Sequence, residues 1–122
     1  MTSLFRQGEA ALDRMFELAA VPVSYRRDGV TVAVDIPAKL GKTLFRADDN
    51  YGVTIRTERR DFILRASDLP LKEPKSGDEI RFDGKCYQVN APNGEPCWRW
   101  HTRLTHTQLR IHANYIGDAK NE

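Results

Sequence analysis

The sequence predicts a mostly β protein of the α+β class, a small β-barrel or sandwich of short antiparallel strands preceded by one amphipathic helix. Two Asp-Gly pairs, at 28–29 and 83–84, each lie between segments in which apolar and polar residues alternate. Further short extended segments follow at the spacing of roughly 8–12 residues that is typical of such folds. The length of 122 residues suits a single domain, 1–122, that needs no disulfide or metal to fold.

Residues 2–20 are expected to form the helix. Thr2 or Ser3 can cap its start, and Pro22 ends it. Apolar side chains recur at spacings of three, four and seven residues, which places them on one side of a helix: Leu4, Ala11, Leu12, Met15, Phe16 and Ala19. We expect this stripe to pack on the β domain, 22–117, or on a neighbouring subunit.

The first hairpin is predicted at 23–34. Asp28-Gly29 suits a type I′ turn, because both central positions of that turn need positive φ. The register that follows would place the apolar residues of both strands on one face. It pairs Arg27 with Val30, Tyr25 with Val32, and Val23 with Val34.

A second hairpin is predicted at 79–89, where the Asp83-Gly84 turn pairs Phe82 with Lys85 and Ile80 with Tyr87. Between the hairpins, extended segments are expected at 43–46, 53–57 and 62–64, with a polar loop at 48–52. A last strand is expected near 107–116. Its alternation turns one set of side chains inward and His112 outward: Leu109, Ile111, Ala113 and Tyr115.

Charge is spread evenly along the chain. The net charge is +2, with 10 basic and 9 acidic residues in 1–61 and 9 and 8 in 62–122. Because no basic block stands out, a dedicated nucleic-acid binder is disfavoured. The charged N-terminus lacks the apolar core of a signal peptide, and no apolar run is long enough to span a membrane. Two cysteines are too few for a disulfide scaffold, so we expect a cytosolic protein with reduced thiols and no membrane partner.

Motifs for cofactor chemistry are incomplete. The "GKT" at 41–43 lacks the glycine that a phosphate-binding loop needs five positions earlier, where Ile36 stands, and is expected to be a turn followed by a strand. The "DDNYG" at 48–52 fails as a calcium loop, because the later ligand positions are not filled. Only His101 and His106 have a spacing suited to zinc. No cofactor or metal is therefore expected.

An enzyme is not expected either. Cys97 follows Pro96 at the start of an extended segment, away from any predicted helix that would activate the thiol. The carboxylate pairs Asp48/Asp49 and Asp78/Glu79 fall in turns, where we expect solvated charge.

The segment "CWRWHT" at 97–102 is a further candidate site. On a strand, Trp98 and Trp100 share one face, and Arg99 and His101 share the other. The two rings form either a core layer or an exposed contact ridge, and Trp and Arg are enriched at interface hot spots.

The densest positive cluster, "RTERR" at 56–60, is either solvated or pairs with acidic residues of a neighbouring subunit, and the same holds for "RRD" at 26–28. The predicted partner-contact residues are drawn from this cluster, from "CWRWHT" and from the helix stripe: Trp98, Arg99, Trp100, Arg56, Arg59, Arg60, Leu12 and Phe16.

Three ordered segments resemble a known family. "VSYRRDGVTVAV" resembles an early "VTYRRG…SV" hairpin, and "GKTLF…DDNYGVTIRTERRDFILRASDL" resembles "GRT.F…YG…ESRDFLI.A.DL". "GDEIRFDGKCYQVNAPNGEPCWRWHT…LRIHANYI" resembles a closing "GD.I…Y.V..P.GEP.WRW…..LRIHT" block. These patterns, covering about residues 20–116, resemble small head–tail joining (head-completion) proteins of tailed bacteriophages and prophages. The chain departs from the pattern mildly, at Cys97 and His101.

The resemblance implies a structural virion protein of the head–tail connector, assembled in the bacterial host cytoplasm. Such proteins form rings below the portal, where they close the DNA channel and dock the tail. The partners implied are further copies of the chain, portal or adaptor proteins and tail-terminator proteins, with packaged DNA near by. No catalytic residues are carried over. The alternative function is a small β-barrel module that binds nucleic acid or a ligand through an aromatic and arginine face.

Overall fold

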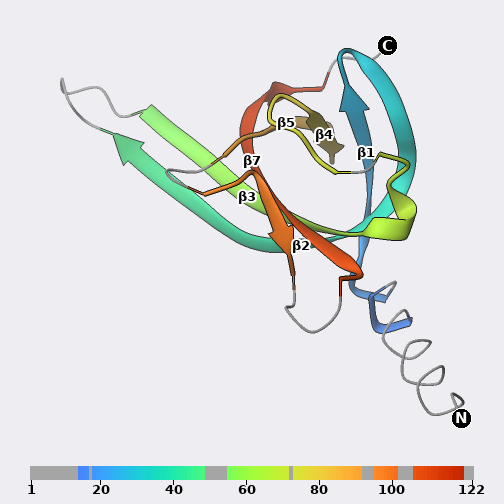
Figure 1. The fold of residues 1–122 in the computed structure, drawn as a ribbon. Coiled ribbons are helices and arrows are strands. Elements are labelled where there is room, and N and C mark those ends of the chain that lie inside the picture. Colours follow the sequence, from blue (N-terminus) through green and yellow to red (C-terminus); the bar gives the residue numbers. More distant parts are fainter. Residues whose placement is uncertain are drawn as a thin grey trace, which may run out of the picture.

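The computed structural model describes residues 14–16, 18–48, 55–71, 73–91, 95–101 and 106–119; for 42–48 and 55–57 it describes the backbone alone. Seven strands and a short 3₁₀ helix are present in this part of the chain (Figure 1). They are β1 (Val21–Arg27), β2 (Val30–Asp48), β3 (Ile55–Arg65), η1 (Ala66–Asp68), β4 (Glu79–Phe82), β5 (Lys85–Val89), β6 (Trp98–Trp100) and β7 (Gln108–Asp118).

Six of these strands form a closed antiparallel barrel. Their order is β3-β2-β1-β4-β5-β7, and pairing of β3 with β7 closes the ring of strands. Strand β6 also pairs with β7. Because β3 occupies one edge of β7 along 108–114, β5 and β6 must follow one another along the other edge. Of the two predicted architectures, barrel and sandwich, the structure has the barrel.

The predicted N-terminal helix is visible only in part. Residues 14–16 and 18–19 have helical backbone, and the rest of the expected 2–20 helix lies outside the described residues. The Phe16 side chain is 1% exposed, whereas Met15 is 66% exposed. The stripe therefore does not pack on the barrel as a whole. No helix in the described ranges is long and apolar enough to cross a membrane.

The first hairpin has the predicted turn but not the predicted register. Asp28 and Gly29 have φ of 54° and 78°, as a type I′ turn requires, and Arg27 pairs with Val30. The register holds as far as the Arg26–Thr31 pair, and beyond it the prediction is wrong, because two β-bulges each add a residue to β2. The structure instead pairs Tyr25 with Ala33 and Val23 with Ile36. The expected single buried apolar face is not formed either, since Val30 and Val34 are exposed.

The second hairpin and the last strand follow the sequence closely. Phe82 pairs with Lys85 and Ile80 with Tyr87, around an Asp83-Gly84 turn with φ of 52° and 72°. Strand β7 spans Gln108–Asp118 and buries alternate side chains from Leu109 to Ala113. The predicted short strands at 43–46 and 62–64 are instead parts of two long ones, β2 and β3, and β3 also contains residues 55–57 of the predicted 53–57 strand, of which 53–54 lie outside the described residues.

The expected turn at 41–43 is also wrong, because these residues lie inside β2. A β-bulge separates the Leu40–Phe62 pair from the Thr43–Arg60 pair. A Cβ atom at Gly41 would come 2.8 Å from the Cβ of Asp61 on β3, so glycine allows the two strands to approach.

The barrel interior is filled by side chains. The largest fully buried ones are Tyr25, Tyr87, Phe16, Phe62, Leu64, Ile80, Ile111, Val23 and Val89, and all but Phe16 belong to one core cluster. Phe62 and Tyr87 meet edge to face with ring centroids 5.2 Å apart. Apolar burial and aromatic contacts therefore hold the barrel together.

Candidate partner-contact surface

Strand β6 presents its two tryptophans to its own barrel. Trp98 and Trp100 pair with Ile111 and Leu109, which are buried in the core, and both rings are half-buried against the core cluster. The rings lie 5.2 Å apart, edge to face. Trp100 also stacks on His106 at 4.7 Å with an interplanar angle of 4°. This face of β6 is largely occupied within the chain.

The other face of β6 belongs to a row of four residues on the outside of the sheet, three of them cations and the fourth Ile63. Register pairs Lys39 with Ile63, Ile63 with Arg110, and Arg110 with Arg99. The row thus crosses β2, β3, β7 and β6, about 14 Å at the usual strand spacing. We call these four residues the outer row. Arg99 is exposed, and Lys39 and Arg110 are half-buried.

Asp61 is the carboxylate bonded to the outer row. Its Oδ2 accepts a hydrogen bond from Nε of Arg110 at 2.8 Å, and its Oδ1 lies 2.7 Å from Nδ1 of His112. His112 therefore points outward, as predicted. Asp61 offsets the charge of Arg110, so in the described part of the chain the net positive charge of this row comes from Arg99 and Lys39.

The pKa of His101 is affected by this positive charge. Its Nδ1 lies 3.5 Å from Nη1 of Arg110. Burial lowers the pKa of His101, and the charges of Lys39, Arg110 and Arg99 lower it further. The imidazole is therefore kept neutral beside the outer row at pH 7.

The predicted arginine cluster divides between the two faces of β3. Arg59 lies on the outer face, where its Nε donates to Oδ1 of Asn114 at 3.3 Å. Arg60 lies on the inner face, 5.6 Å and 5.8 Å from the rings of Phe82 and Tyr87. Arg60 also forms an ion pair with Glu58 at 3.3 Å. The neutralised Arg60 is thus separated from the outer row.

The other predicted contact residues lie elsewhere. The Phe16 ring is held against its own chain by Lys39 and Arg65, each 5.3 Å from the ring centroid. The Arg56 side chain and Leu12 lie outside the described residues. The structure therefore brings Arg59 and Arg99 to one face and places Trp98 and Trp100 on the other.

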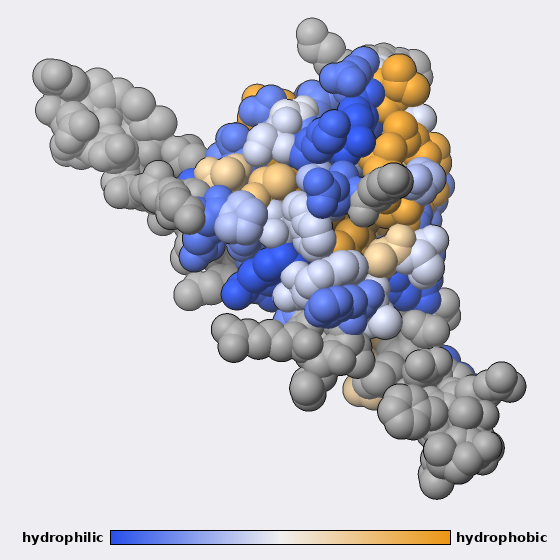
Figure 2. All heavy atoms as spheres, viewed as in Figure 1, coloured by the Kyte–Doolittle hydropathy of each residue, from blue (hydrophilic) through white to orange (hydrophobic). Residues whose placement is uncertain are grey.

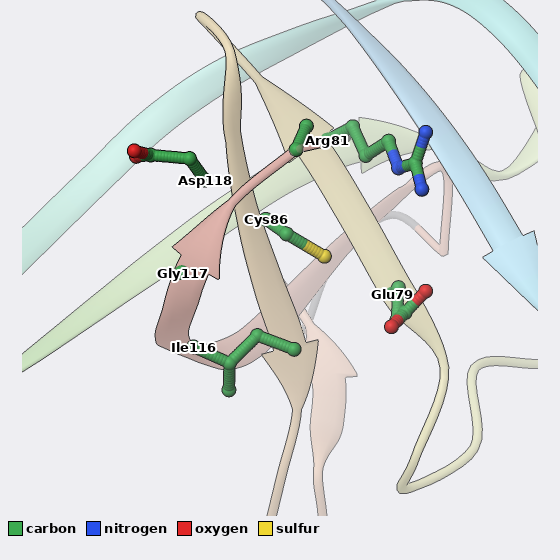
Figure 3. Close-up of a pocket in the computed structure, with 7 residues that line it drawn as sticks. Glu79, Arg81, Cys86, Ile116, Gly117 and Asp118 are labelled. Carbon is green, nitrogen blue, oxygen red and sulfur yellow. The ribbon is translucent and has the colours of Figure 1, made fainter. Parts of the chain in front are cut away.

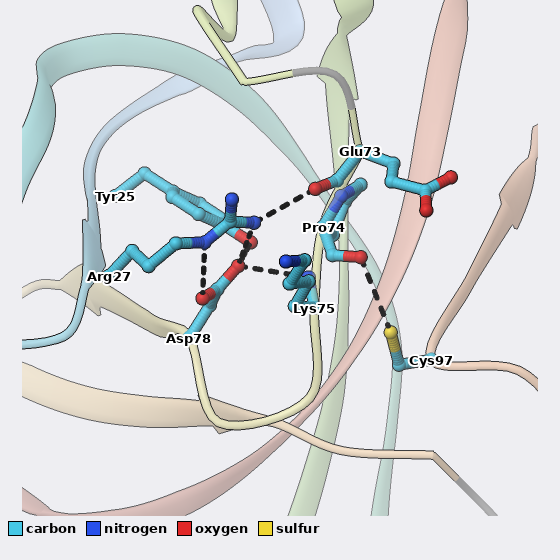
Figure 4. A network of polar contacts seen from close by, with 7 residues as sticks. All are labelled: Tyr25, Arg27, Glu73, Pro74, Lys75, Asp78 and Cys97. Atoms are coloured by element: carbon cyan, nitrogen blue, oxygen red, sulfur yellow. Dashed lines mark hydrogen bonds and ion pairs between the residues drawn. The ribbon is translucent and has the colours of Figure 1, made fainter.

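A buried polar network on the barrel was not anticipated from the sequence (Figure 4). Asp78 is 3% exposed, so the prediction that it is solvated is wrong. Arg27 donates two hydrogen bonds to its carboxylate, at 2.9 Å and 2.8 Å, and the Tyr25 hydroxyl donates a third. The backbone amide of Lys75 donates a fourth at 2.9 Å. The network fixes the 73–78 loop to β1.

The hydrogen bonds decide the charge state of this network. Burial raises the pKa of Asp78, but the hydrogen bonds from Arg27, Tyr25 and the Lys75 amide outweigh burial and hold that pKa below its usual value. Burial and the bond to Asp78 raise the pKa of Tyr25. Both groups are therefore locked in one protonation state near neutrality, which suits a structural rather than a proton-transfer role.

The cysteine and histidine side chains considered as candidates for chemistry do not form a common site. Cys97 is buried, with its Sγ 3.8 Å from the carbonyl oxygen of Pro74. His101 and His106, the pair with zinc-like spacing, contact Arg110 and Trp100 respectively. Among the described residues, no three of the His, Cys, Asp and Glu side chains are grouped so as to hold a metal ion.

An open pocket of about 190 Å³ lies on the outside of the barrel (Figure 3). Its lining carries both signs of charge, with Glu79, Arg81 and Asp118 around Cys86 and Ile116. Burial and the nearby Glu79 raise the pKa of Cys86, so the thiol stays protonated. The pocket is thus a mixed surface hollow with an unreactive thiol.

Comparison with known proteins identifies the family. A family model described as phage head-tail joining protein matches residues 2–120, nearly the whole chain. No curated protein gives a significant match. The family is structural, and its role implies contacts with other phage head and tail proteins and a place in the virion. With a closed barrel and a match of this extent, the chain belongs to the phage head-tail joining protein family.

Proposed function

We propose that this protein is a ring-forming subunit of the head–tail connector, placed below the portal, where it closes the DNA channel and docks the tail. The observation that carries the proposal is the family match over residues 2–120. The closed barrel supports it, because a rigid module with separate surface patches suits an assembly in which each copy meets several neighbours.

We assign the outer row to a contact with a neighbouring protein. Arg99 is exposed at its end, Lys39 adds charge, and burial together with the charges of Lys39, Arg110 and Arg99 lowers the pKa of His101. An acidic surface on a portal, tail or neighbouring subunit would be attracted to this row. Arg59 lies on the same outer face and extends the cationic surface.

The alternative, binding of nucleic-acid bases on the tryptophans, has less support. Base stacking needs an open aromatic face. Trp100 stacks on His106, and both tryptophans pack against the core. Packaged DNA near the connector would meet cations rather than an aromatic platform.

The test is assembly in a phage that carries this gene. Without the protein, filled heads and free tails should accumulate, and added purified protein should restore infectious particles. Electron microscopy should then show density for the protein at the portal vertex. Equal titres with and without the protein would refute the connector role.

The outer row is tested by charge reversal. Arg99→Glu should lower the yield of joined particles at least tenfold, and Lys75→Glu, which reverses another exposed cation, serves as the matched control. Thermal melting of both variants separates loss of contact from loss of fold. Joining that is equally efficient with both variants would remove Arg99 from the contact surface.

A further inference from the structure

Much of the barrel surface seen in Figure 1 is hydrophilic, and apolar residues gather along the side over which β2 runs (Figure 2). A partner that docks away from that side must be held by charge and hydrogen bonds. His101, directly after β6, lies among groups suited to such a contact. Its backbone N–H donates to the carbonyl oxygen of Gln108 at 2.8 Å, which continues the pairing of β6 with β7. Three cations act on its ring: Lys39 from β2, Arg99 from β6 and Arg110 from β7.

The Arg110 side chain extends from β7 across β3 to β2. Its Nε donates a hydrogen bond to Asp61 on β3 at 2.8 Å, and its Nη2 lies 3.2 Å from the position that a Cβ atom at Gly41 on β2 would occupy. Its Nη1 lies 3.5 Å from Nδ1 of His101. The other oxygen of Asp61 lies 2.7 Å from Nδ1 of His112. Asp61 is therefore held on the Nε side of the guanidinium, and Nη1 lies next to His101.

This contact decides which nitrogen of the neutral His101 ring carries the proton. A guanidinium only donates hydrogen bonds, so Nδ1, which faces Arg110, is the nitrogen without the proton, and Nε2 carries it. The side chains of Lys39 and Arg99 also offer donors alone. We call Lys39, Arg99, His101 and Arg110 the donor site. The ligand that fits such a site is negatively charged and only accepts hydrogen bonds, as a carboxylate or a phosphate does.

The charge of the donor site favours a carboxylate of a protein. Asp61 offsets Arg110, so within the described part of the chain the net positive charge of the site comes from Lys39 and Arg99. Duplex DNA carries one negative charge per about 1.7 Å of its axis, and proteins that bind it present many cations along a stripe. Two cations suit one or two carboxylates better than a phosphate backbone. The family role, which implies contacts with other phage head and tail proteins, supports the same ligand.

We propose that the donor site binds a carboxylate of the docked protein and that docking adds a proton to His101. The proton comes from solvent and binds to Nδ1, which can then no longer accept from Arg110. Little is lost, because a nitrogen–nitrogen distance of 3.5 Å makes a weak hydrogen bond. The carboxylate becomes the acceptor for both Arg110 and the imidazolium. The inference rests on the proposed contact of the outer row, and it adds the chemical group that binds there and its dependence on pH.

The direction of the pH dependence follows from the pKa of His101. Burial and the charges of Lys39, Arg110 and Arg99 hold that pKa below its ordinary value, so the ring is neutral at pH 7.5 before docking. A carboxylate beside the ring raises the pKa. Affinity should therefore rise as pH falls from the pKa of the docked state to that of the free protein, and stay constant outside this range. Aspartates of the partner remain ionised above about pH 5, so their charge does not change in this window.

The test is binding of a hexa-aspartate peptide, followed by NMR between pH 5.5 and 7.5. Saturating peptide should raise the pKa of His101 by about 1, and the wild type should bind the peptide at least threefold more tightly at pH 5.5 than at pH 7.5. His101→Gln should bind it equally at both pH values. His106→Gln, which removes an exposed imidazole stacked on Trp100, is the matched control and should keep the pH dependence. An unchanged His101 pKa, or a pH dependence that persists in His101→Gln, would overturn the inference.

Two further measurements identify the ligand and the site. A DNA strand of seven nucleotides has six phosphates, and we expect the peptide to bind more tightly than this strand at pH 5.5 and equal ionic strength. Tighter binding of the DNA would overturn a protein carboxylate as the ligand. Arg99→Gln should weaken peptide binding at both pH values, and an unchanged affinity would show that the peptide does not bind at the donor site. The NMR titration uses the wild type, so it decides the question even if a variant fails to fold.

Joining of filled heads to tails separates this inference from the connector role. At a limiting concentration, purified wild-type protein should join them at least threefold more efficiently at pH 5.5 than at pH 7.5, and His101→Gln should join them equally at both. Joining by the wild type that does not depend on pH would refute the coupling and leave the connector role standing. Failure of the wild type to join heads and tails at either pH would refute the connector role itself.

Discussion

Asp78→Asn should strongly destabilise the fold, because it keeps the shape of the side chain and removes its charge. The carboxylate accepts hydrogen bonds from Arg27, Tyr25 and the Lys75 amide, all of them donors. An amide group would point its own N–H toward at least one of them. Breaking a buried ion pair by removing one partner costs about 3–5 kcal/mol. Since the Arg27 side chain is 21% exposed, water relieves part of this loss, and we expect about 3 kcal/mol.

Urea unfolding followed by tryptophan fluorescence measures this loss. With a typical slope for a domain of this size, about 3 kcal/mol lowers the midpoint by about 1–2 M. Glu73→Gln is the matched control, because it removes a carboxylate from the same loop while its backbone oxygen still accepts from Arg27. The Glu73 side chain is exposed, so we expect a change within about 0.5 kcal/mol. Equal losses in the two variants would refute the buried network as a source of stability.

The pH dependence of the free energy of unfolding gives a second test of the Asp78 network. Because its folded pKa is lowered, the stabilisation is complete above the pKa of the unfolded chain, about 4, and is lost as pH falls toward the folded pKa. The free energy of unfolding of the wild type should therefore fall more steeply below pH 4 than that of Asp78→Asn. Parallel acid profiles would contradict the assignment.

Three further outcomes are expected. Burial raises the pKa of Tyr87 to about 12, so the contribution of Tyr87 to stability is complete below pH 10. Between pH 10 and 12 that contribution falls by about 1.4 kcal/mol per pH unit. Alkaline melts of Tyr87→Phe should therefore show a shallower loss of stability than those of the wild type. NMR titration should place the pKa of His101 below 6.5, and Lys39→Gln should raise that pKa. An unchanged value would show that the charge of Lys39 does not act on His101. Gly41→Ala should destabilise by about 1–3 kcal/mol in urea, because the added Cβ would lie 2.8 Å from Asp61, and a neutral result would show that β2 and β3 can separate.

The sequence predicts the local parts of this fold well. Asp83-Gly84 determines a turn from two residues, and the pairs that follow it in β4 and β5 are as expected. Alternation likewise identifies the buried side of β7. Where pairing is decided by the turn and the next few residues, a pattern read along the chain is sufficient.

The errors come from contacts between distant residues. The two bulges that β2 forms against β1 lie between Thr31 and Ile36, before β3 begins to pair with it at Ala38, and alternation within Val30–Val34 carries no sign of them. Asp78 follows Gly77 in a turn-like segment, yet it is buried by Tyr25 and Arg27, 53 and 51 residues earlier. The outer row is likewise assembled from four strands, and only Arg99 was singled out beforehand.

The filled interior of the barrel bears on how any passage for DNA is built. Tyr25, Phe62 and Tyr87 occupy the centre of the closed sheet, so no duplex can thread through a single subunit. In a ring the opening would be the space enclosed by several copies. Its diameter would then depend on subunit number and on the angle between neighbours. Substitutions at subunit contacts would change the bore of the ring, whereas substitutions in the barrel core would change only the stability of each subunit.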